Sequence, residues 1–195
     1  MTDERLQVRY VPLGTLELWR GNPKKHEPAQ LATSIRRYGF KDPPKFEPSL
    51  NQSRGGIVEG NGRTAVLRAM KEAGDEPPRG IAVDQDGNWL VPVLFGLDAK
   101  SRAEAEAYGV DHNALTLGGS GLAFEDLVQL FDEEALQSLL RDTPDASELL
   151  VSLGTADLDA LLSGPDFRPA TAGDQSRLDE REPLVCPECG AEIPR

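Results

Sequence analysis

The stretch GIVEGNGRTAVLRA, residues 56–69, decides the fold of this chain. Its apolar start predicts a short strand, Gly60 and Gly62 predict a turn, and the alanine and leucine pattern that follows predicts a helix up to Gly74. Glycine lets a ligand approach the backbone, and the N–H groups at a helix start attract an anion. Arg63 stands at that start, where its guanidinium can hold a phosphate through two hydrogen bonds. The stretch predicts either a phosphate or nucleotide cradle or an ordinary strand-to-helix turn, and these residues alone leave both open.

The composition describes one ordinary domain with an appendage. The 195 residues are enough to bury a core, no apolar run approaches the roughly 18 residues of a membrane span, and the opening MTDER is unlike a signal peptide. We therefore expect a cytoplasmic protein without membrane contact.

The net charge of −12 is unevenly distributed. Residues 1–70 carry 12 Lys and Arg against 7 Asp and Glu, whereas residues 71–195 carry 9 against 26. A contact with DNA or a polyphosphate is therefore expected on the N-terminal basic surface, because the acidic remainder repels phosphates. The alternative is that this surplus is only a solvated surface.

A basic loop, WRGNPKKH at residues 19–26, precedes a second predicted helix. Asn-Pro starts a turn, Pro28 suits the first turn of a helix, and Gly39 suits its end. Lys24 and Lys25 therefore stand just before a helix start, where they either contact an anion or remain solvated.

Two further short motifs suggest chemistry. Asp111, His112 and Asn113 either reach Mg²⁺ or a γ-phosphate or simply cap a helix. Asp-Pro-Pro at residues 42–44 is similar to a methyltransferase motif, but Lys45 replaces its aromatic residue, so no methyltransferase is predicted.

The other elements are predicted from apolar alternation and turn residues. We expect strand pieces within residues 6–18, a strand after Lys45, a hairpin of residues 80–83 and 89–95, and a helix over residues 99–108 that GVDHN closes.

These motifs, in this order, resemble the ParB/sulfiredoxin superfamily over residues 10–117. The matching motifs are NPK at 22–24, SIxxYG at 34–39, GNGRxA at 60–65, VPV at 91–93 and DHN at 111–113. The resemblance implies an α+β (mixed α/β) domain that binds a nucleoside triphosphate, CTP or ATP, with Mg²⁺. The nucleotide-binding residues that it implies are Asn22, Lys24, Lys25, Gly60, Asn61, Gly62, Arg63, Thr64, His112 and Asn113.

Departures from the family pattern restrict the chemistry. Asn61 stands where sulfiredoxins have their reducing cysteine, which excludes that reductase activity. Gly62 replaces an arginine of partition proteins, and His112 stands where an acidic residue is expected, so metal binding and hydrolysis are left open. Glu59 is a candidate catalytic base or metal ligand, or else an exposed strand-end residue. A weak NTPase, a nuclease accessory and a protein without catalysis all remain open.

Four regions are expected along the chain. Residues 5–117 form the nucleotide-binding domain, and residues 118–163 an acidic helical region. That region contains one cation, Arg141, so a DNA-binding helix-turn-helix is not expected there, and it resembles the tail of phage and methylase-associated relatives. Its predicted helices span residues 122–131, 133–140, 147–153 and 155–162. A flexible linker over residues 164–183 and a tail over residues 184–195 complete the chain.

The tail contains Cys186 and Cys189 in the form CPECG, half of a zinc knuckle. Structural zinc takes four ligands, so two chains would share one Zn²⁺ as a homodimer or another protein would complete the site. A redox-labile cysteine pair is the alternative.

Two main functions therefore remain, and small-molecule kinase chemistry on the same fold stays open as a third. The first is a ParB-like nucleotide-binding protein acting in DNA transactions such as partition, phage or modification systems. The second is a catalytically inactive regulatory module that docks a DNA-processing protein through its acidic helices. Nucleotide binding that depends on Arg63 distinguishes the first from the second.

Overall fold

The computed structural model describes residues 5–118, 130–143, 145, 150, 184–185 and 192–193. The chain forms two compact units, Met1–Leu162 and Ser163–Arg195. In the second unit, β6 (Leu184–Val185) pairs antiparallel with β7 (Glu192–Ile193). Cys186 and Cys189 lie outside the described residues, so the zinc site stays a prediction.

The first unit is built around β5 (Trp89–Phe95), the apolar strand of the predicted hairpin. It pairs antiparallel with β1 (Gln7–Pro12) and β4 (Ala82–Val83) and parallel with β2 (Lys45–Glu47). Beyond β2 lies β3 (Gly56–Glu59), which is antiparallel to it. The fold is therefore mixed α/β, as expected.

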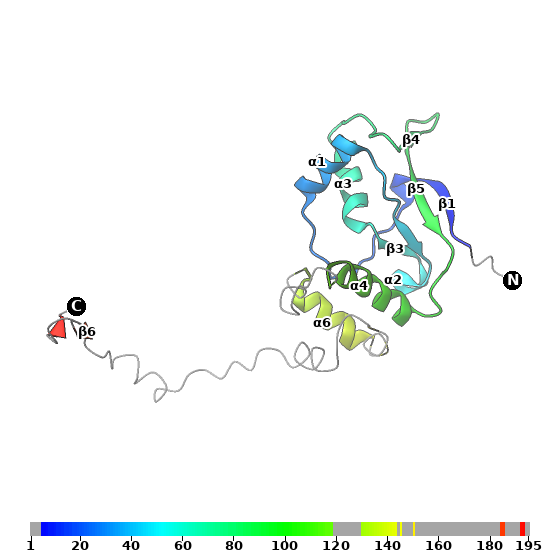
Figure 1. The fold of residues 1–195 in the computed structure, drawn as a ribbon. Coiled ribbons are helices and arrows are strands. Elements are labelled where there is room, and N and C mark those ends of the chain that lie inside the picture. Colours follow the sequence, from blue (N-terminus) through cyan, green and yellow to red (C-terminus); the bar gives the residue numbers. More distant parts are fainter. Residues whose placement is uncertain are drawn as a thin grey trace. The chain divides into compact units, whose positions relative to one another are not determined.

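Two helices pack together against this sheet. They are α1 (Pro28–Tyr38) and α3 (Asn61–Glu72), and Figure 1 shows them side by side. Both helices are confirmed. The local signals are Pro28 and Gly39 at the ends of α1, and Gly60 and Gly74 on either side of α3. The buried cluster between these helices and the sheet consists of Leu13, Leu16, Ile35, Phe40, Ile57, Val66, Leu67, Met70, Trp89, Val91 and Val93.

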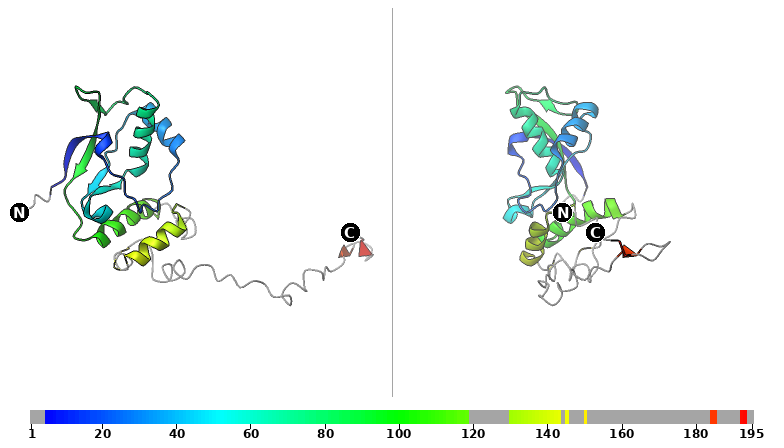
Figure 2. Two further views of the ribbon diagram at one scale, coloured as in Figure 1. Left: turned by 180° about the vertical axis from the view of Figure 1, so that it is seen from behind. Right: turned by 90° about the vertical axis from the view of Figure 1, so that its left-hand side faces the viewer.

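A second buried cluster joins α4 (Arg102–Gly118) and α6 (Glu133–Asp142) to the opposite side of β3. Ile57 belongs to the first cluster and Val58 to the second, since successive strand residues point to opposite faces. Both views in Figure 2 show α6 against α4. In α6, Leu136, Leu139 and Leu140 are buried. The helix expected over residues 133–140 is thus confirmed, and it packs on the core that β3 and α4 share.

The predicted end of the fourth helix is wrong. The helix was expected to close at residues 109–113, but α4 continues through Gly109, Asp111, His112 and Asn113 to Gly118. A Cβ on Gly109 would lie 2.6 Å from Cζ3 of Trp19 and 3.2 Å from Cγ2 of Val58. The absence of a side chain at Gly109 therefore lets α4 pack closely on Trp19, and Gly109 does not end the helix.

Smaller differences concern short elements. Only β1 forms a strand within residues 6–18, followed by a 3₁₀ turn, η1 (Leu13–Thr15), and a single bridge from Leu18 to Ile57. A short turn, α2 (Leu50–Ser53), was not predicted. The helices expected over residues 122–131, 147–153 and 155–162 lie almost entirely outside the described residues.

None of the described helices is long and apolar enough to cross a membrane.

Candidate functional site

The turn between β3 and α3 has the geometry that its glycines suggest. Gly60 precedes the helix with φ of +89°, a left-handed conformation that favours glycine, and a Cβ there would lie 2.8 Å from Cβ of Pro44. No side chain caps the start of α3. The N–H groups of its first turn, which have no partner within the helix, are therefore available to a ligand.

The basic loop before α1 lies against this turn. A Cβ on Gly62 would approach Nδ1 of His26 to 2.7 Å, so the absence of a side chain lets the imidazole pack on the start of α3. The Asn22 side-chain amide lies 3.3 Å from Nε2 of His26, and its oxygen accepts a hydrogen bond from the Lys24 N–H at 3.2 Å. Asn22 thus orders the loop around the imidazole.

The segment before α6 fixes the same loop from the other side. The Lys25 N–H donates to the Leu130 carbonyl at 2.8 Å, and the Asp132 N–H donates to the Pro23 carbonyl at 2.6 Å. Asp132 also caps α6, accepting from the Ala135 N–H at 2.9 Å. The acidic helical region and the basic loop are therefore connected by backbone hydrogen bonds.

The loop, the turn and the middle of α4 enclose a hollow of about 130 Å³, which we call the cradle. It brings together every predicted nucleotide-binding residue except Lys25 and Thr64, together with Glu59. The lining residues are Asn22, Lys24, His26, Leu31, Val58, Glu59, Gly60, Asn61, Gly62, Arg63, His112 and Asn113.

Three basic side chains of the cradle share one partly buried environment. Burial, and then the charge of Arg63, hold the pKa of Lys24 below its ordinary value. Burial, followed by Lys24 and Arg63, likewise lowers the pKa of His26 from 6.5, so its imidazole is neutral at pH 7. Lys24 and Arg63 are two cations held close together and partly removed from water, and an anion would relieve their repulsion, which makes the cradle electrostatically suited to phosphate.

Arg63 forms an ion pair and has one buried donor without a partner among the described residues. Its Nη2 lies 2.8 Å from Oδ2 of Asp42, whose side chain is largely exposed. Within the described part of the chain, the Arg63 Nε–H is the buried side-chain donor without a hydrogen-bond partner. Buried donors of this kind are uncommon, and a bound ligand is one way to satisfy them.

Glu59 lies at the end of β3, where two side chains of α4 meet it. Its Oε1 accepts a hydrogen bond from the Tyr108 hydroxyl, and its Oε2 lies 3.4 Å from Nε2 of His112. Burial and the contact with Glu59 raise the pKa of Tyr108, which stays protonated. Glu59 is mostly buried and engaged on both oxygens, so it is not the exposed strand-end residue that the sequence left open.

Two predicted residues stabilise the turn with their side chains. The Asn61 side-chain oxygen accepts from the Trp19 N–H at 2.9 Å, and its amide donates to the Ile57 carbonyl at 2.8 Å. Thr64 is fully buried, and its hydroxyl donates to the Gly60 carbonyl at 2.9 Å. Asn61 is therefore left with its backbone N–H for a ligand, and Thr64 supports the turn from behind.

The remaining predicted residues differ in placement. Lys25 is exposed and outside the cradle lining, whereas Asn113 lines the cradle and donates to the Gly109 carbonyl at 2.7 Å. His26 and Asp42 were not predicted as site residues. His26 belongs to the basic loop, and its position four residues after Asn22 is the one signal that could have identified it. Asp42 carries no such signal, because only the fold brings it to Arg63.

The described residues contain no group of three His, Cys, Asp or Glu side chains able to hold a metal ion. Glu59 is the one carboxylate in the lining of the cradle. Mg²⁺ at nucleotide sites is often bound by one or two carboxylates together with phosphate oxygens and water. Glu59 therefore fits a metal that a nucleotide brings with it, but not a metal bound by protein alone.

A similarity to known proteins is found among solved structures. No protein family matches the chain, and no curated protein does. Among solved structures, the chain is similar to the C-terminally truncated chromosome-partitioning protein ParB from Caulobacter crescentus complexed with CTP-γ-S, with 19% identity and a TM-score of 0.38 over 86% of this chain and 88% of that one. At that level the similarity assigns neither a ligand nor a residue role to this chain, and the superfamily stays a prediction from the motifs.

Proposed function

We propose that the chain binds a nucleoside triphosphate, with its phosphates in the cradle. The observation that carries the proposal is the convergence of Lys24, His26 and Arg63 on the uncapped start of α3. Helix N–H groups, a left-handed glycine and an arginine form a site for an anion with several oxygens. The unpaired Nε–H of Arg63 supports the same ligand.

The size of the cradle favours phosphates over a whole nucleotide. Its volume of about 130 Å³ lies below the roughly 300 Å³ of the smallest ordinary ligand sites. The phosphates would occupy the cradle, and the sugar and base would lie outside it. The choice between CTP and ATP therefore depends on contacts beyond the cradle.

Glu59 would bind Mg²⁺ that arrives with the nucleotide. Glu59 would supply a carboxylate oxygen to the ion, and the ion would offset the charge of the phosphates. Both oxygens of Glu59 are already in contact, one with Tyr108 and the other with His112, so the carboxylate has no unengaged oxygen with which to activate a water. We therefore propose nucleotide binding with slow hydrolysis or none.

The cellular role we propose is in DNA transactions such as partition, phage or modification systems. Support for this role is the order of the motifs that resemble the ParB/sulfiredoxin superfamily, together with the basic surplus of residues 1–70. DNA would contact that basic part of the chain, since phosphates are repelled by the acidic remainder.

The regulatory alternative has one observation in its favour and one against. The exposed face of α6 carries Glu133, Glu134 and Asp142, which suits a basic partner. Its apolar face is already buried, so no hydrophobic surface of this helix remains for docking. Tight binding of a basic protein by a chain without nucleotide affinity would favour this alternative.

The test is titration of the full chain with CTP, ATP and GTP in the presence of Mg²⁺, for wild type, Arg63→Ala and Arg37→Ala. Arg37 is an exposed arginine of α1 outside the cradle, so it controls for the loss of one charge. We expect saturable binding of at least one nucleotide, weakened by about 2 kcal/mol in Arg63→Ala because a charge-assisted contact is lost, and unchanged in Arg37→Ala. Absence of binding by all three nucleotides would disprove the proposal.

A further inference from the structure

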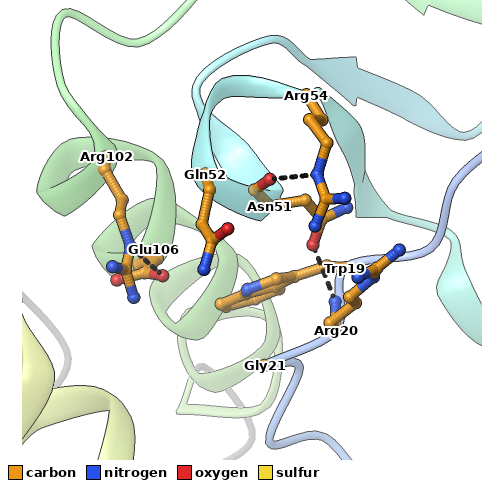
Figure 3. A pocket seen from close by; sticks show the side chains of 8 residues that line it. All are labelled: Trp19, Arg20, Gly21, Asn51, Gln52, Arg54, Arg102 and Glu106. Carbon is orange, nitrogen blue, oxygen red and sulfur yellow. Dashed lines mark hydrogen bonds and ion pairs between the residues drawn. The ribbon is translucent and has the colours of Figure 1, made fainter.

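A second hollow, of about 180 Å³, lies on the first unit between the segment after η1, α2 and the first turns of α4. Figure 3 shows the side chains around it. It shares no lining residue with the cradle, and three of its side chains are arginines from separate stretches of the chain. We call it the arginine hollow, and its lining residues are Trp19, Arg20, Gly21, Asn51, Gln52, Arg54, Arg102 and Glu106.

The three guanidinium groups are held by contacts within the protein. Nε of Arg54 donates to the Asn51 carbonyl at 3.2 Å, and Nε of Arg102 donates to Oε1 of Glu106 at 2.9 Å. Arg20 lies 3.8 Å from Glu17, with both side chains more than 60% exposed. Such an exposed pair contributes little, so Arg20 can exchange this partner for a ligand.

Glu106 is the one carboxylate in the lining, and it is already neutralised. Its side chain is buried, pairs with Arg102 and accepts a hydrogen bond from the Thr143 hydroxyl at 2.6 Å. One buried carboxylate against three arginines leaves the arginine hollow with a positive surplus.

The turn that carries Asn51 and Gln52 has an uncommon backbone. Asn51, Gln52 and Ser53 have φ of +52°, +61° and +61°, a region that residues other than glycine rarely adopt. The Asn51 side chain stabilises the turn by donating to the Leu18 and Gly55 carbonyls at 2.9 Å and accepting from the Arg20 N–H at 3.0 Å. In Figure 3 the turn directs the Gln52 amide toward Trp19. Strained turns of this kind are frequent at binding sites.

The shape of the arginine hollow selects a phosphate over a base. Trp19 forms part of its lining but is only 4% exposed, so it offers no ring face on which a base could stack. The volume is also below that of an ordinary nucleotide-sized site. A phosphate group fits the remaining space and the charge.

We propose that the arginine hollow binds a phosphate group of a nucleic-acid backbone. The side chains of Arg20 and Arg102 are 64% and 49% exposed, so a single free phosphate would gain little from them. A strand brings neighbouring phosphates to several guanidinium groups at once, and its contacts then reinforce one another. The hollow would position the strand without reading its sequence.

The two hollows share no lining residues, so separate variants can test the arginine hollow and the cradle. The test measures binding of a fluorescein-labelled 20-base-pair DNA duplex to the full chain by anisotropy between 50 and 200 mM NaCl. The variants are Arg20→Ala/Arg54→Ala, Gln52→Glu and, as a control, Arg141→Ala, which changes an exposed arginine of α6 outside both hollows. Gln52→Glu adds a negative charge at an exposed position and keeps the side-chain size, so it tests the charge without removing an arginine.

We expect the double variant and Gln52→Glu each to weaken DNA binding about tenfold, and the double variant to reduce the salt slope by about 2. Arg141→Ala should bind DNA nearly as the wild type does. Circular dichroism and thermal unfolding establish that each variant is folded.

Two results would overturn the proposal. One is duplex binding that the double variant and Gln52→Glu leave at the wild-type level. The other is absence of duplex binding. If the fluorescence of a Trp89→Phe variant, which keeps Trp19, then responds to inorganic phosphate, the hollow binds a free anion instead. Arg63→Ala changes the cradle and leaves every lining residue of the arginine hollow in place. A failure of nucleotide binding and a failure of DNA binding can therefore be told apart.

Discussion

The cradle and the arginine hollow are both basic, but they differ in how far their basic side chains are buried. In the cradle, Lys24 and His26 are half-buried and have lowered pKa values because burial and neighbouring charges disfavour their cationic forms. In the arginine hollow, the side chains of Arg20 and Arg102 are about half exposed or more. Partly desolvated cations bind a fitted anion strongly, whereas solvated ones need several contacts at once. The difference favours a compact polyphosphate in the cradle and an extended backbone in the arginine hollow.

One hydrogen bond connects the two sites. Asn61 lines the cradle, and its side chain accepts from the N–H of Trp19, which lines the arginine hollow. Trp19 also packs against Gly109 of α4. The geometry of both sites therefore depends on the same buried contacts, and the following variants test this dependence.

The largest effect is expected from Asn61→Ala. It leaves the Trp19 N–H and the Ile57 carbonyl without their partner in a buried region, so the free energy of unfolding should fall by about 3 kcal/mol. Urea denaturation measures the loss. Asn113→Ala, which removes one local hydrogen bond to Gly109, should cost about 0.5 kcal/mol. Equal losses in the two variants would contradict the connecting role of Asn61.

Gly109→Ala should destabilise the fold by about 1–3 kcal/mol through overpacking against Trp19. In an exposed helix the same change would stabilise by up to about 1 kcal/mol, so the sign of the effect is decisive. Thermal unfolding measures it, with Gly14→Ala as a control, because a Cβ on Gly14 would meet no atom within 4 Å. A stabilised Gly109→Ala would mean that Trp19 does not pack as described.

Asp42→Asn should strengthen nucleotide binding, because Arg63 would no longer be shared with a carboxylate. The Asp42 side chain is exposed, so the gain should be about 0.5–1 kcal/mol. Calorimetric titration measures it. Asp75→Asn is the matched control, since Asp75 pairs with Arg36 at 2.7 Å outside the cradle. A similar gain in nucleotide affinity for both variants would show that removing any negative charge has this effect, and would contradict a specific role of Asp42.

The smallest effect concerns the pH dependence of stability. The pKa of His26 is lowered in the folded chain, so the unfolded chain takes up this proton first as the pH falls below about 6.5. The contribution of neutral His26 to the free energy of unfolding is therefore present above pH 6.5. It is lost as the pH falls through the lowered pKa of the folded chain. Between pH 7.5 and 5.5, His26→Gln should lose less unfolding free energy than the wild type, by under about 1 kcal/mol because the group is only half-buried. Urea denaturation at both pH values gives the comparison, and equal losses would contradict a lowered pKa.

The sequence predicted the parts of the fold that local signals determine. The strand and helix around Gly60, the helix from Pro28 to Gly39 and the hairpin all follow from glycine, proline and apolar patterns within a few residues. The cradle was predictable for the same reason, because its turn and its basic loop each contain their own motif.

Contacts between distant residues could not be predicted from the sequence. Gly109 looked like a helix end, since only the fold reveals that Trp19 occupies the space of its missing side chain. Asn61 looked like a ligand residue, but it bonds the Trp19 backbone 42 positions away. The arginine hollow joins residues 20, 54 and 102, which no motif relates.

The most direct test of the cradle is the NMR signal of the Arg63 Nε–H, assigned by comparison with Arg63→Lys. This buried donor has no hydrogen-bond partner within the part of the chain that the structure describes. On titration with the Mg²⁺ complex of CTP or ATP, its resonance should shift saturably and its exchange with water should slow, because a phosphate oxygen accepts the bond. A nucleotide that binds and shifts other resonances while this one stays unchanged would contradict the central claim that Arg63 holds the phosphates.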